Sequence, residues 1–195
     1  CQACHPCRTG HGNCCENLQV LGVHTDGGMR PLFIVPARKL HPSKKLTLDQ
    51  LALVETLGIG CHAVNRGNPQ PGENVLVIGA GPIGLSVIEF TKLSGARTIV
   101  MDLNEKRLKF CNEKMGIRDT LQIRGDGSEL ETLKEWTDGV LPTVVIDATG
   151  SNKSMSNALN YVGFTGRLVF VGITTNEVSF GHPLMHRREM TLLAS

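Results

Sequence analysis

The chain has 195 residues, enough for one domain of ~150 residues and a smaller second unit. With 41% hydrophobic and 19% charged residues, its composition is that of a globular protein able to build a core. The formal net charge of +2, without a basic cluster, argues against nucleic acid as a partner. No apolar run reaches ~18 residues, so the sequence predicts no membrane-spanning helix and no membrane partner.

Both ends of the chain have the character of cut ends. The first residue is Cys1, with neither an initiator methionine nor a signal peptide before it. The last residues, 189–195, are typical of a strand, but the sequence stops there without closing a structure. We therefore expect the chain to be a fragment of a longer protein.

Five of the seven cysteines lie within the first fifteen residues. An odd, clustered set does not suit a disulfide framework, whereas short spacings suit a metal site in a reducing compartment, which predicts a cytoplasmic location. Cys1, Cys4 and Cys7, followed by Cys14 or Cys15, offer four thiolates. Four sulfurs with no open position are typical of a structural zinc site. A redox pair would use only two of these cysteines, and a zinc ribbon usually has two separated pairs.

The stretch between the cysteines and residue 70 contains one expected strand and one expected helix. Residues 32–35 form a short apolar run that ends at a proline, which predicts a strand. Residues 47–65 have apolar positions at helical spacing, with Thr47 or Asp49 as the N-cap. Glu55 lies among the apolar positions of this helix, where partial exposure is the default for a carboxylate that has no partner.

From residue 74 onward, apolar strand runs alternate with helical segments. The expected strands are 74–79, 97–102, 119–123, 143–147, 166–172 and 189–195, and the expected helices are 82–94, 104–115, 127–138 and 152–162. This alternation predicts an α/β fold, a doubly wound parallel six-stranded Rossmann sheet. We therefore expect a partial domain with a zinc lobe at 1–45, a connecting helix at 46–70 and a dinucleotide-binding domain at 71–195.

A glycine-rich turn follows the first strand of this region. Its candidate cofactor-binding residues are Gly79, Gly81, Pro82, Ile83 and Gly84. Strand, glycine turn and helix bring backbone N–H groups close to a pyrophosphate at the positive end of the helix. Asp102 ends the second strand, where an acid binds ribose hydroxyls and repels a 2′-phosphate, so NAD is favoured over NADP. Lys106, Arg107 and Lys109 weaken that preference, unless they form an ordinary solvated helix face.

Ligands of doubly wound sheets bind at the carboxyl ends of the strands, near the switch point. Residues 79–84, Asp102, 147–150 and 171–173 should therefore surround one crevice.

Four features together resemble the zinc-dependent medium-chain alcohol dehydrogenases. They are the cysteine loop, residues 55–57 with 61–64, the glycine turn at 79–84, and Val171 with Gly172. The resemblance extends over essentially the whole chain and is closer to the branch of sorbitol, threonine and sugar-acid dehydrogenases. Thr56 replaces the proline that is typical of this branch, a departure that leaves the neighbouring acid unchanged.

The resemblance implies a mostly β catalytic domain with a zinc lobe, of which this chain carries a part. It selects Cys15 over Cys14 as the fourth structural zinc ligand. It also gives Glu55, rather than Cys61, the position that ligates or neighbours a catalytic zinc. The other ligands of that zinc and the proton-relay residues belong to segments that this sequence does not include.

The resemblance further implies cofactor contacts and an activity. Arg107 matches a position that contacts the adenosine ribose, and Thr149 and Val171 match backbone contacts to the nicotinamide side. The implied enzyme is zinc-dependent and NAD-linked, and it moves hydride between a secondary alcohol of a polyol or sugar acid and nicotinamide. A threonine dehydrogenase-like enzyme and a non-catalytic dinucleotide-binding domain are the alternatives. Family members are commonly homodimers or homotetramers.

Overall fold

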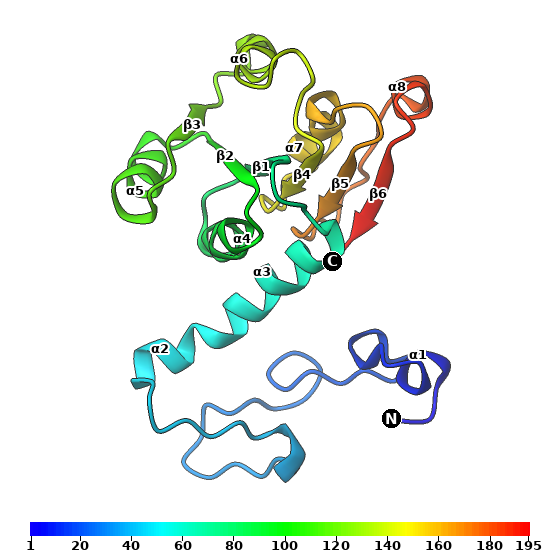
Figure 1. Cartoon of the computed structure of the whole chain (residues 1–195). Coiled ribbons are helices and arrows are strands. Elements are labelled where there is room, and N and C mark those ends of the chain that lie inside the picture. The colour runs from blue at the N-terminus through cyan, green and yellow to red at the C-terminus, as the bar shows by residue number, and fades with distance from the viewer. The chain divides into compact units, whose positions relative to one another are not determined.

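The computed structural model describes all 195 residues, which form two compact units. The first unit is Cys1–Leu46 and the second is Thr47–Ser195. Figure 1 shows the elements of both units coloured along the chain. None of the helices is both long enough and apolar enough to cross a membrane.

The first unit consists mainly of loops. Its helical turns are α1 (His5–Arg8), η1 (Gly12–Cys14) and η2 (Ala37–Lys39). It contains no strand, only an isolated bridge between Leu21 and Thr25. The prediction of a strand at 32–35 was wrong: Leu32 and Ile34 are 88% and 97% exposed, and the segment pairs with no other strand. An apolar run becomes a strand only where a neighbouring strand forms hydrogen bonds with its backbone. The prolines on both sides of this run have no backbone N–H to donate to such a neighbour.

The second unit begins with two helices, α2 (Leu48–Ala52) and α3 (Val54–Gly67). The sequence predicted one continuous helix here, but the structure divides it at Leu53, whose N–H bonds to the carbonyl of Gln50 at 3.2 Å. Thr47 is the N-cap of α2, and it forms a capping box with Gln50. The divided helix leads directly into the sheet.

The sheet has six strands, as predicted. They are β1 (Asn74–Ile78), β2 (Arg97–Asp102), β3 (Asp119–Gln122), β4 (Val144–Asp147), β5 (Arg167–Phe170) and β6 (Thr191–Ala194). All neighbouring strands are parallel, in the order β3-β2-β1-β4-β5-β6. The order reverses between β1 and β4, so the carboxyl ends of these two strands define the crevice in which such sheets bind ligands.

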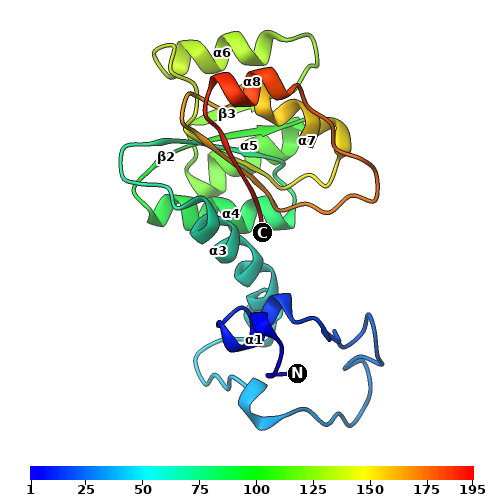
Figure 2. The same ribbon diagram turned by 90° about the vertical axis from the view of Figure 1, so that its right-hand side faces the viewer.

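Helices cover both faces of the sheet, which confirms the doubly wound fold. They are α4 (Pro82–Leu93), α5 (Glu105–Met115), α6 (Ser128–Trp136), α7 (Asn152–Ala158), η3 (Leu159–Tyr161) and α8 (His182–Arg187). Helices α3, α4 and α5 supply the core on one face, and α6, α7, η3 and α8 supply it on the other (Figure 2). The central strands β1 and β4 are mainly apolar because both of their faces are covered.

Helix α8 was not predicted. It has only six residues, too few to show a helical period, and it begins with a proline near its first position. Leu184 and Met185 pack against the core on the face of α6 and α7. Packing, rather than intrinsic propensity, therefore stabilises this short helix.

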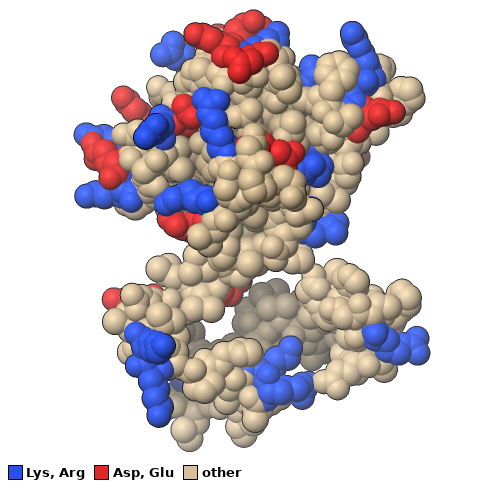
Figure 3. All heavy atoms as spheres, in the orientation of Figure 1, with Lys and Arg blue, Asp and Glu red and all other residues tan.

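A polar network joins β5 to the segments that precede β1 and β4, at the amino ends of the strands. Glu73 pairs with Arg167 Nη2 at 2.6 Å and accepts a hydrogen bond from Thr143 Oγ1 at 2.8 Å. The backbone N–H of Gln70 donates to the same carboxylate at 2.7 Å. In the face shown in Figure 3, acidic and basic side chains of residues 47–195 alternate without a broad patch of one sign.

Candidate cofactor cleft and zinc lobe

The glycine turn between β1 and α4 requires its glycines for steric reasons. Gly79 has φ +96°, and a Cβ there would lie 2.9 Å from Thr149 Cγ2. A Cβ on Gly84 would lie 1.7 Å from the carbonyl oxygen of Gly79, so only glycine allows α4 to pack this closely on the turn. Gly81 is the N-cap of α4 and Pro82 its first residue. The first turn of α4 thus leaves backbone N–H groups and the positive end of its dipole for an anion.

Asp102 ends β2 with only 5% of its surface exposed. Its Oδ2 accepts a hydrogen bond from the N–H of Ala80 at 2.6 Å, and its Oδ1 accepts one from the N–H of Asn104 at 2.7 Å. Arg107 Nη1 lies 3.6 Å from Oδ2. Each carboxylate oxygen has two lone pairs, so both can still accept a ribose hydroxyl while the backbone holds the side chain in place.

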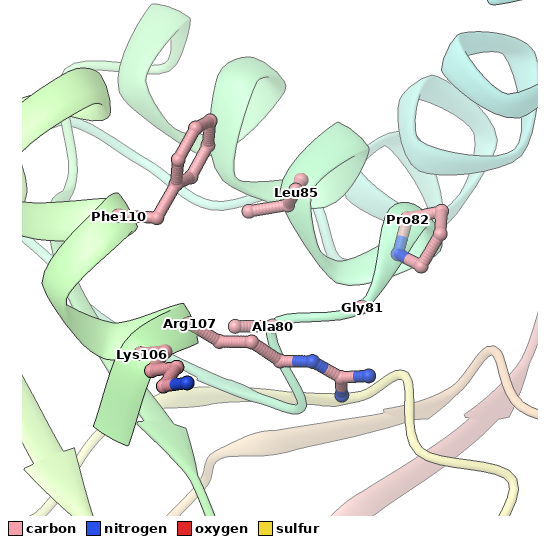
Figure 4. A pocket seen from close by; sticks show the side chains of 7 residues that line it. All are labelled: Ala80, Gly81, Pro82, Leu85, Lys106, Arg107 and Phe110. Atoms are coloured by element: carbon pink, nitrogen blue, oxygen red, sulfur yellow. The ribbon is translucent and has the colours of Figure 1, made fainter. Parts of the chain in front are cut away.

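A small hollow of about 310 Å³ lies beside Asp102, between α4 and α5. Figure 4 shows its lining: Ala80, Gly81, Pro82, Leu85, Lys106, Arg107 and Phe110. Arg107 extends from α5 toward the turn at Gly81, with Leu85 and Phe110 on the apolar side of the hollow. This corner therefore combines one buried carboxylate, which would repel a 2′-phosphate, with two cations, which would attract one.

Asp147 ends β4 and is completely buried. Its Oδ1 accepts hydrogen bonds from the N–H and the hydroxyl of Thr149 at 2.9 and 2.7 Å, and its Oδ2 accepts one from Ser154 Oγ at 2.6 Å. The carboxylate thereby ties the loop after β4 to the first turn of α7. Thr149 is thereby held in position in the lining of the cleft that Asp102 also lines.

One large cleft, of about 1240 Å³, runs along these carboxyl ends. Of the predicted cofactor-binding residues, those that line it are Gly79, Gly81, Pro82, Ile83, Asp102, Arg107 and Thr149. Gly84 and Val171 do not line it: Gly84 packs against the turn, and Val171 is a core residue with 8% exposure. Their contacts with a cofactor stay predictions.

Several residues that line the cleft were not predicted as part of any site, and two of them are buried and titratable. Glu129, on α6, and Tyr161, on η3, are 2% and 6% exposed, and both line the cleft. Burial, and after it the charge of Glu129, raises the pKa of Tyr161. No motif marks either residue, because an acid in the first turn of a helix is an ordinary end signal.

The cysteine loop brings four sulfurs together. The Sγ atoms of Cys1, Cys4, Cys7 and Cys15 all lie within 4.8 Å of one another, with 4.0 Å between those of Cys4 and Cys15. Four sulfurs placed 2.3 Å from a zinc ion would lie about 3.8 Å apart, so this set fits a tetrahedral Zn²⁺. Cys14 is exposed and is not a member of the set.

Hydrogen bonds within the loop also involve its sulfur atoms. The backbone N–H of Cys4 donates to Cys1 Sγ at 3.4 Å. The side-chain hydrogen bond with Cys4, followed by burial, raises the pKa of Cys7. Thiolates are the species that bind zinc, so metal uptake here releases protons.

Glu55 is exposed in the first turn of α3, and the four cysteines form the only group of three or more metal-binding residues in the structure. The helix around it is held close to α4: Ser86 Oγ donates to the carbonyl of Thr56 at 2.7 Å. A Cβ at Gly60 would lie 1.9 Å from Ser86 Oγ. The position of Glu55 on a firmly packed helix is therefore defined, and its role at a metal stays a prediction.

Comparisons with known proteins agree on one family. Residues 82–195 match the family model described as zinc-binding dehydrogenase. L-galactonate-5-dehydrogenase of Escherichia coli K12 is 38% identical over 197 residues, covering 100% of this chain and 57% of that protein.

Solved structures show the same architecture. An alcohol dehydrogenase from Escherichia coli CFT073, solved with NADH, has a TM-score of 0.91 and 28% identity, covering 100% of this chain and 58% of its own. A zinc-binding dehydrogenase from Sinorhizobium meliloti 1021, solved with NADP, has a TM-score of 0.88 and 27% identity, with the same coverage. The chain thus spans a little over half the length of these relatives. It belongs to the zinc-binding dehydrogenase family, that is, to the zinc-type medium-chain alcohol dehydrogenases.

Proposed function

We propose that the protein carrying this chain is a zinc-dependent oxidoreductase that moves hydride between a secondary alcohol and the nicotinamide of NAD. The observation that carries the proposal is the convergence of the glycine turn, the first turn of α4 and buried Asp102 on one cleft. The name of the relative L-galactonate-5-dehydrogenase supports a sugar acid, or a similar polyol, as the alcohol.

In this proposal the chain binds and orients the cofactor. The N–H groups at the start of α4 hold the pyrophosphate, and Asp102 accepts hydrogen bonds from the adenosine ribose, with Arg107 beside it. Thr149, fixed by Asp147, lies on the nicotinamide side of the cleft. Hydride transfer depends on this orientation, which the protein supplies before the substrate arrives.

Two metal roles belong to the same proposal. Cys1, Cys4, Cys7 and Cys15 would hold a structural zinc that stabilises a loop without a core of its own. A catalytic zinc supplies Lewis-acid polarisation of the alcohol oxygen when it is bound. Glu55 is the residue of this chain that we place at or beside that second metal.

The cofactor preference is proposed from charge. Asp102 would repel a 2′-phosphate, whereas Lys106 and Arg107 would attract one, and the relatives include complexes with NADH and with NADP. The carboxylate is buried and fixed by two backbone N–H groups, while the Arg107 side chain is 53% exposed and screened by solvent. We therefore favour NAD.

Fluorescence titration of the purified chain with NADH and NADPH tests this proposal. We expect tighter binding of NADH, and we expect Asp102→Asn to narrow the NADH-to-NADPH affinity ratio by roughly tenfold, since about 1.4 kcal/mol corresponds to that factor. Asp119→Asn is the matched control, because Asp119 pairs with Arg97 at the opposite end of the strands. If the wild-type chain bound neither nucleotide, or bound both equally, the NAD proposal would fail.

Identification of the substrate requires an assay of the whole enzyme. Reduction of NAD should be followed with a panel of sugar acids, polyols and L-threonine, and the proposal expects the highest kcat/KM for a sugar acid or polyol. A preference for L-threonine would select the alternative enzyme.

A homodimer or homotetramer is also proposed, because β6 is an edge strand with only β5 beside it. Light scattering of the whole protein tests that assembly. The cytoplasmic location stays a prediction.

A further inference from the structure

The cofactor cleft extends past Asp102 into the space between α6 and α7. Ile123, directly after β3, donates its N–H to the carbonyl of Asp102 at 3.0 Å, so this extension begins one strand away from the ribose-binding acid. Leu103, Ile123 and Leu130 give it apolar walls. In a dinucleotide whose ribose lies on Asp102 and whose pyrophosphate lies on the glycine turn, the adenine is the part that points away from the turn. The apolar side chains beside Asp102 suit the faces of that ring.

One buried carboxylate opens into this extension. Glu129 is only 2% exposed, and its Oε1 accepts hydrogen bonds from the N–H groups of Arg124 and Gly125 at 2.5 and 2.7 Å. Its Oε2 makes no hydrogen bond within the chain. Because every side-chain nitrogen or oxygen atom sealed from solvent does have a partner, Oε2 must open to solvent space, and Glu129 lines the cleft. An acceptor is therefore available in the part of the cleft that Leu103, Ile123 and Leu130 line, where Arg124 and Asn160 are also lining residues.

Glu129 is ionised at neutral pH. Burial alone would raise the pKa of its carboxyl group, but the backbone hydrogen bonds, led by that from Gly125, outweigh burial and lower it. An ionised carboxylate is an acceptor only and forms stronger hydrogen bonds than a neutral group. Its complement is a donor on the ligand.

We propose that Glu129 reads the adenine ring: Oε2 accepts a hydrogen bond from the exocyclic amine, and the apolar walls hold the ring faces. This inference rests on the proposed NAD site and adds the base to it. A base with a carbonyl at the same position would place two oxygen acceptors against each other, and Oε2 could regain a donor only if the ring shifted toward its N1–H, which is costly in a buried site. The cleft should therefore discriminate adenine from hypoxanthine.

The hollow beside Phe110 is the competing place for the base. It offers apolar walls and the two cations Lys106 and Arg107, but no carboxylate lines it. If the adenine ring bound in that hollow, Glu129 would not contribute to the difference in affinity between a base with an amine and a base with a carbonyl. The two placements therefore predict different responses to a change at residue 129.

The experiment compares NADH with its hypoxanthine analogue, reduced nicotinamide hypoxanthine dinucleotide, by fluorescence titration. We expect the wild-type chain to bind NADH at least tenfold more tightly. Glu129→Gln keeps Oε1 as acceptor for the loop but presents an amide donor to the cleft, so it should abolish or reverse this preference. Glu131→Gln is the matched control, since Glu131 lies on the same helix, is 73% exposed and pairs with Lys134 at 2.9 Å. Urea unfolding of each variant establishes that it is folded.

The outcomes separate the two proposals. Tight NADH binding without discrimination by the wild type, or discrimination that Glu129→Gln leaves unchanged, would overturn the role of Glu129 and leave the NAD site intact. Loss of the preference in Glu131→Gln as well would also contradict it. If the folded wild-type chain bound neither dinucleotide, the proposed function and this inference would fail together.

Discussion

The carboxylate of Asp147 offers the sharpest test of how the cleft wall is built. It is completely buried, and it accepts three hydrogen bonds, two from Thr149 and one from Ser154. In Asp147→Asn the remaining oxygen can keep both bonds to Thr149, and the new amide can donate to Ser154. The network thus survives in outline but loses its charge.

The expected cost follows from the bonds. A hydrogen bond to a charged group contributes about 1.5–3 kcal/mol and a neutral one about 0.5–1.5 kcal/mol, so three bonds lose about 3 kcal/mol in total. The variant no longer has the cost of burying a charge, which offsets part of the lost hydrogen-bond energy. We therefore expect the free energy of unfolding to fall by about 2 kcal/mol in total. Asp147→Ala leaves the N–H of Thr149 and two hydroxyls without an acceptor, and should cost about 4 kcal/mol.

Urea unfolding and NADH titration of the same samples check these values. Ser154→Ala removes one donor and keeps the carboxylate with both Thr149 bonds, so it should cost only about 1 kcal/mol. Both Asp147 variants should also weaken NADH binding severalfold, because Thr149 loses its support. The reasoning is refuted if Asp147→Ala is as stable as Ser154→Ala, or if NADH affinity is the same in all four proteins.

Three further predictions concern the metal, the pH dependence and the catalytic role. Cys15→Ser should lose the zinc that wild type and Cys14→Ser each bind at about one ion per chain by elemental analysis; equal loss in both variants would contradict the ligand set. Burial raises the pKa of Glu73, but hydrogen bonds from a backbone N–H, a threonine hydroxyl and Arg167 lower it below its usual value. Glu73 therefore stabilises the fold fully above pH about 4.3, and this contribution is lost as pH falls through the lowered pKa. Glu73→Gln should accordingly be less stable than wild type near neutral pH in urea unfolding and equal to it in strong acid, and an equal difference at every pH would count against this pairing. In the whole enzyme Glu55→Ala should lower kcat substantially and leave NAD affinity unchanged; unaltered steady-state turnover would remove that role.

Much of the fold was predictable because its signals are local. The central strands β1 and β4 are short runs of mainly apolar residues, and glycine, proline or a helical segment separates most of the six strands from their neighbours. The exceptions have physical reasons. Residues 32–35 have the pattern of a strand but no neighbour to pair with, and α8 is too short to show a period before it packs on the core.

The candidate site also contains residues that the sequence located and a residue that only the structure revealed. The glycine turn and the acid after β2 are neighbours of a strand, so spacing alone locates them. The resemblance selected Cys15 over Cys14 as a zinc ligand, a choice that stays a prediction, and Cys15 is the one of the two whose sulfur lies in the cluster. Glu129 has no such signal, because its importance depends on which of its two oxygens is left without a partner.

The sequence by itself determined the order of strands and helices, the glycine positions where a side chain cannot fit, and the cysteine spacing of the zinc lobe. These properties depend on residues close together along the chain, whose geometry a few backbone angles define. Only the tertiary structure decided that Asp102 receives the N–H of Ala80, that Asp147 holds Thr149 and Ser154, and that Glu129 opens to the cleft. Those outcomes depend on how the strands and helices pack, because burial determines which polar atoms must find partners and which remain available to a ligand.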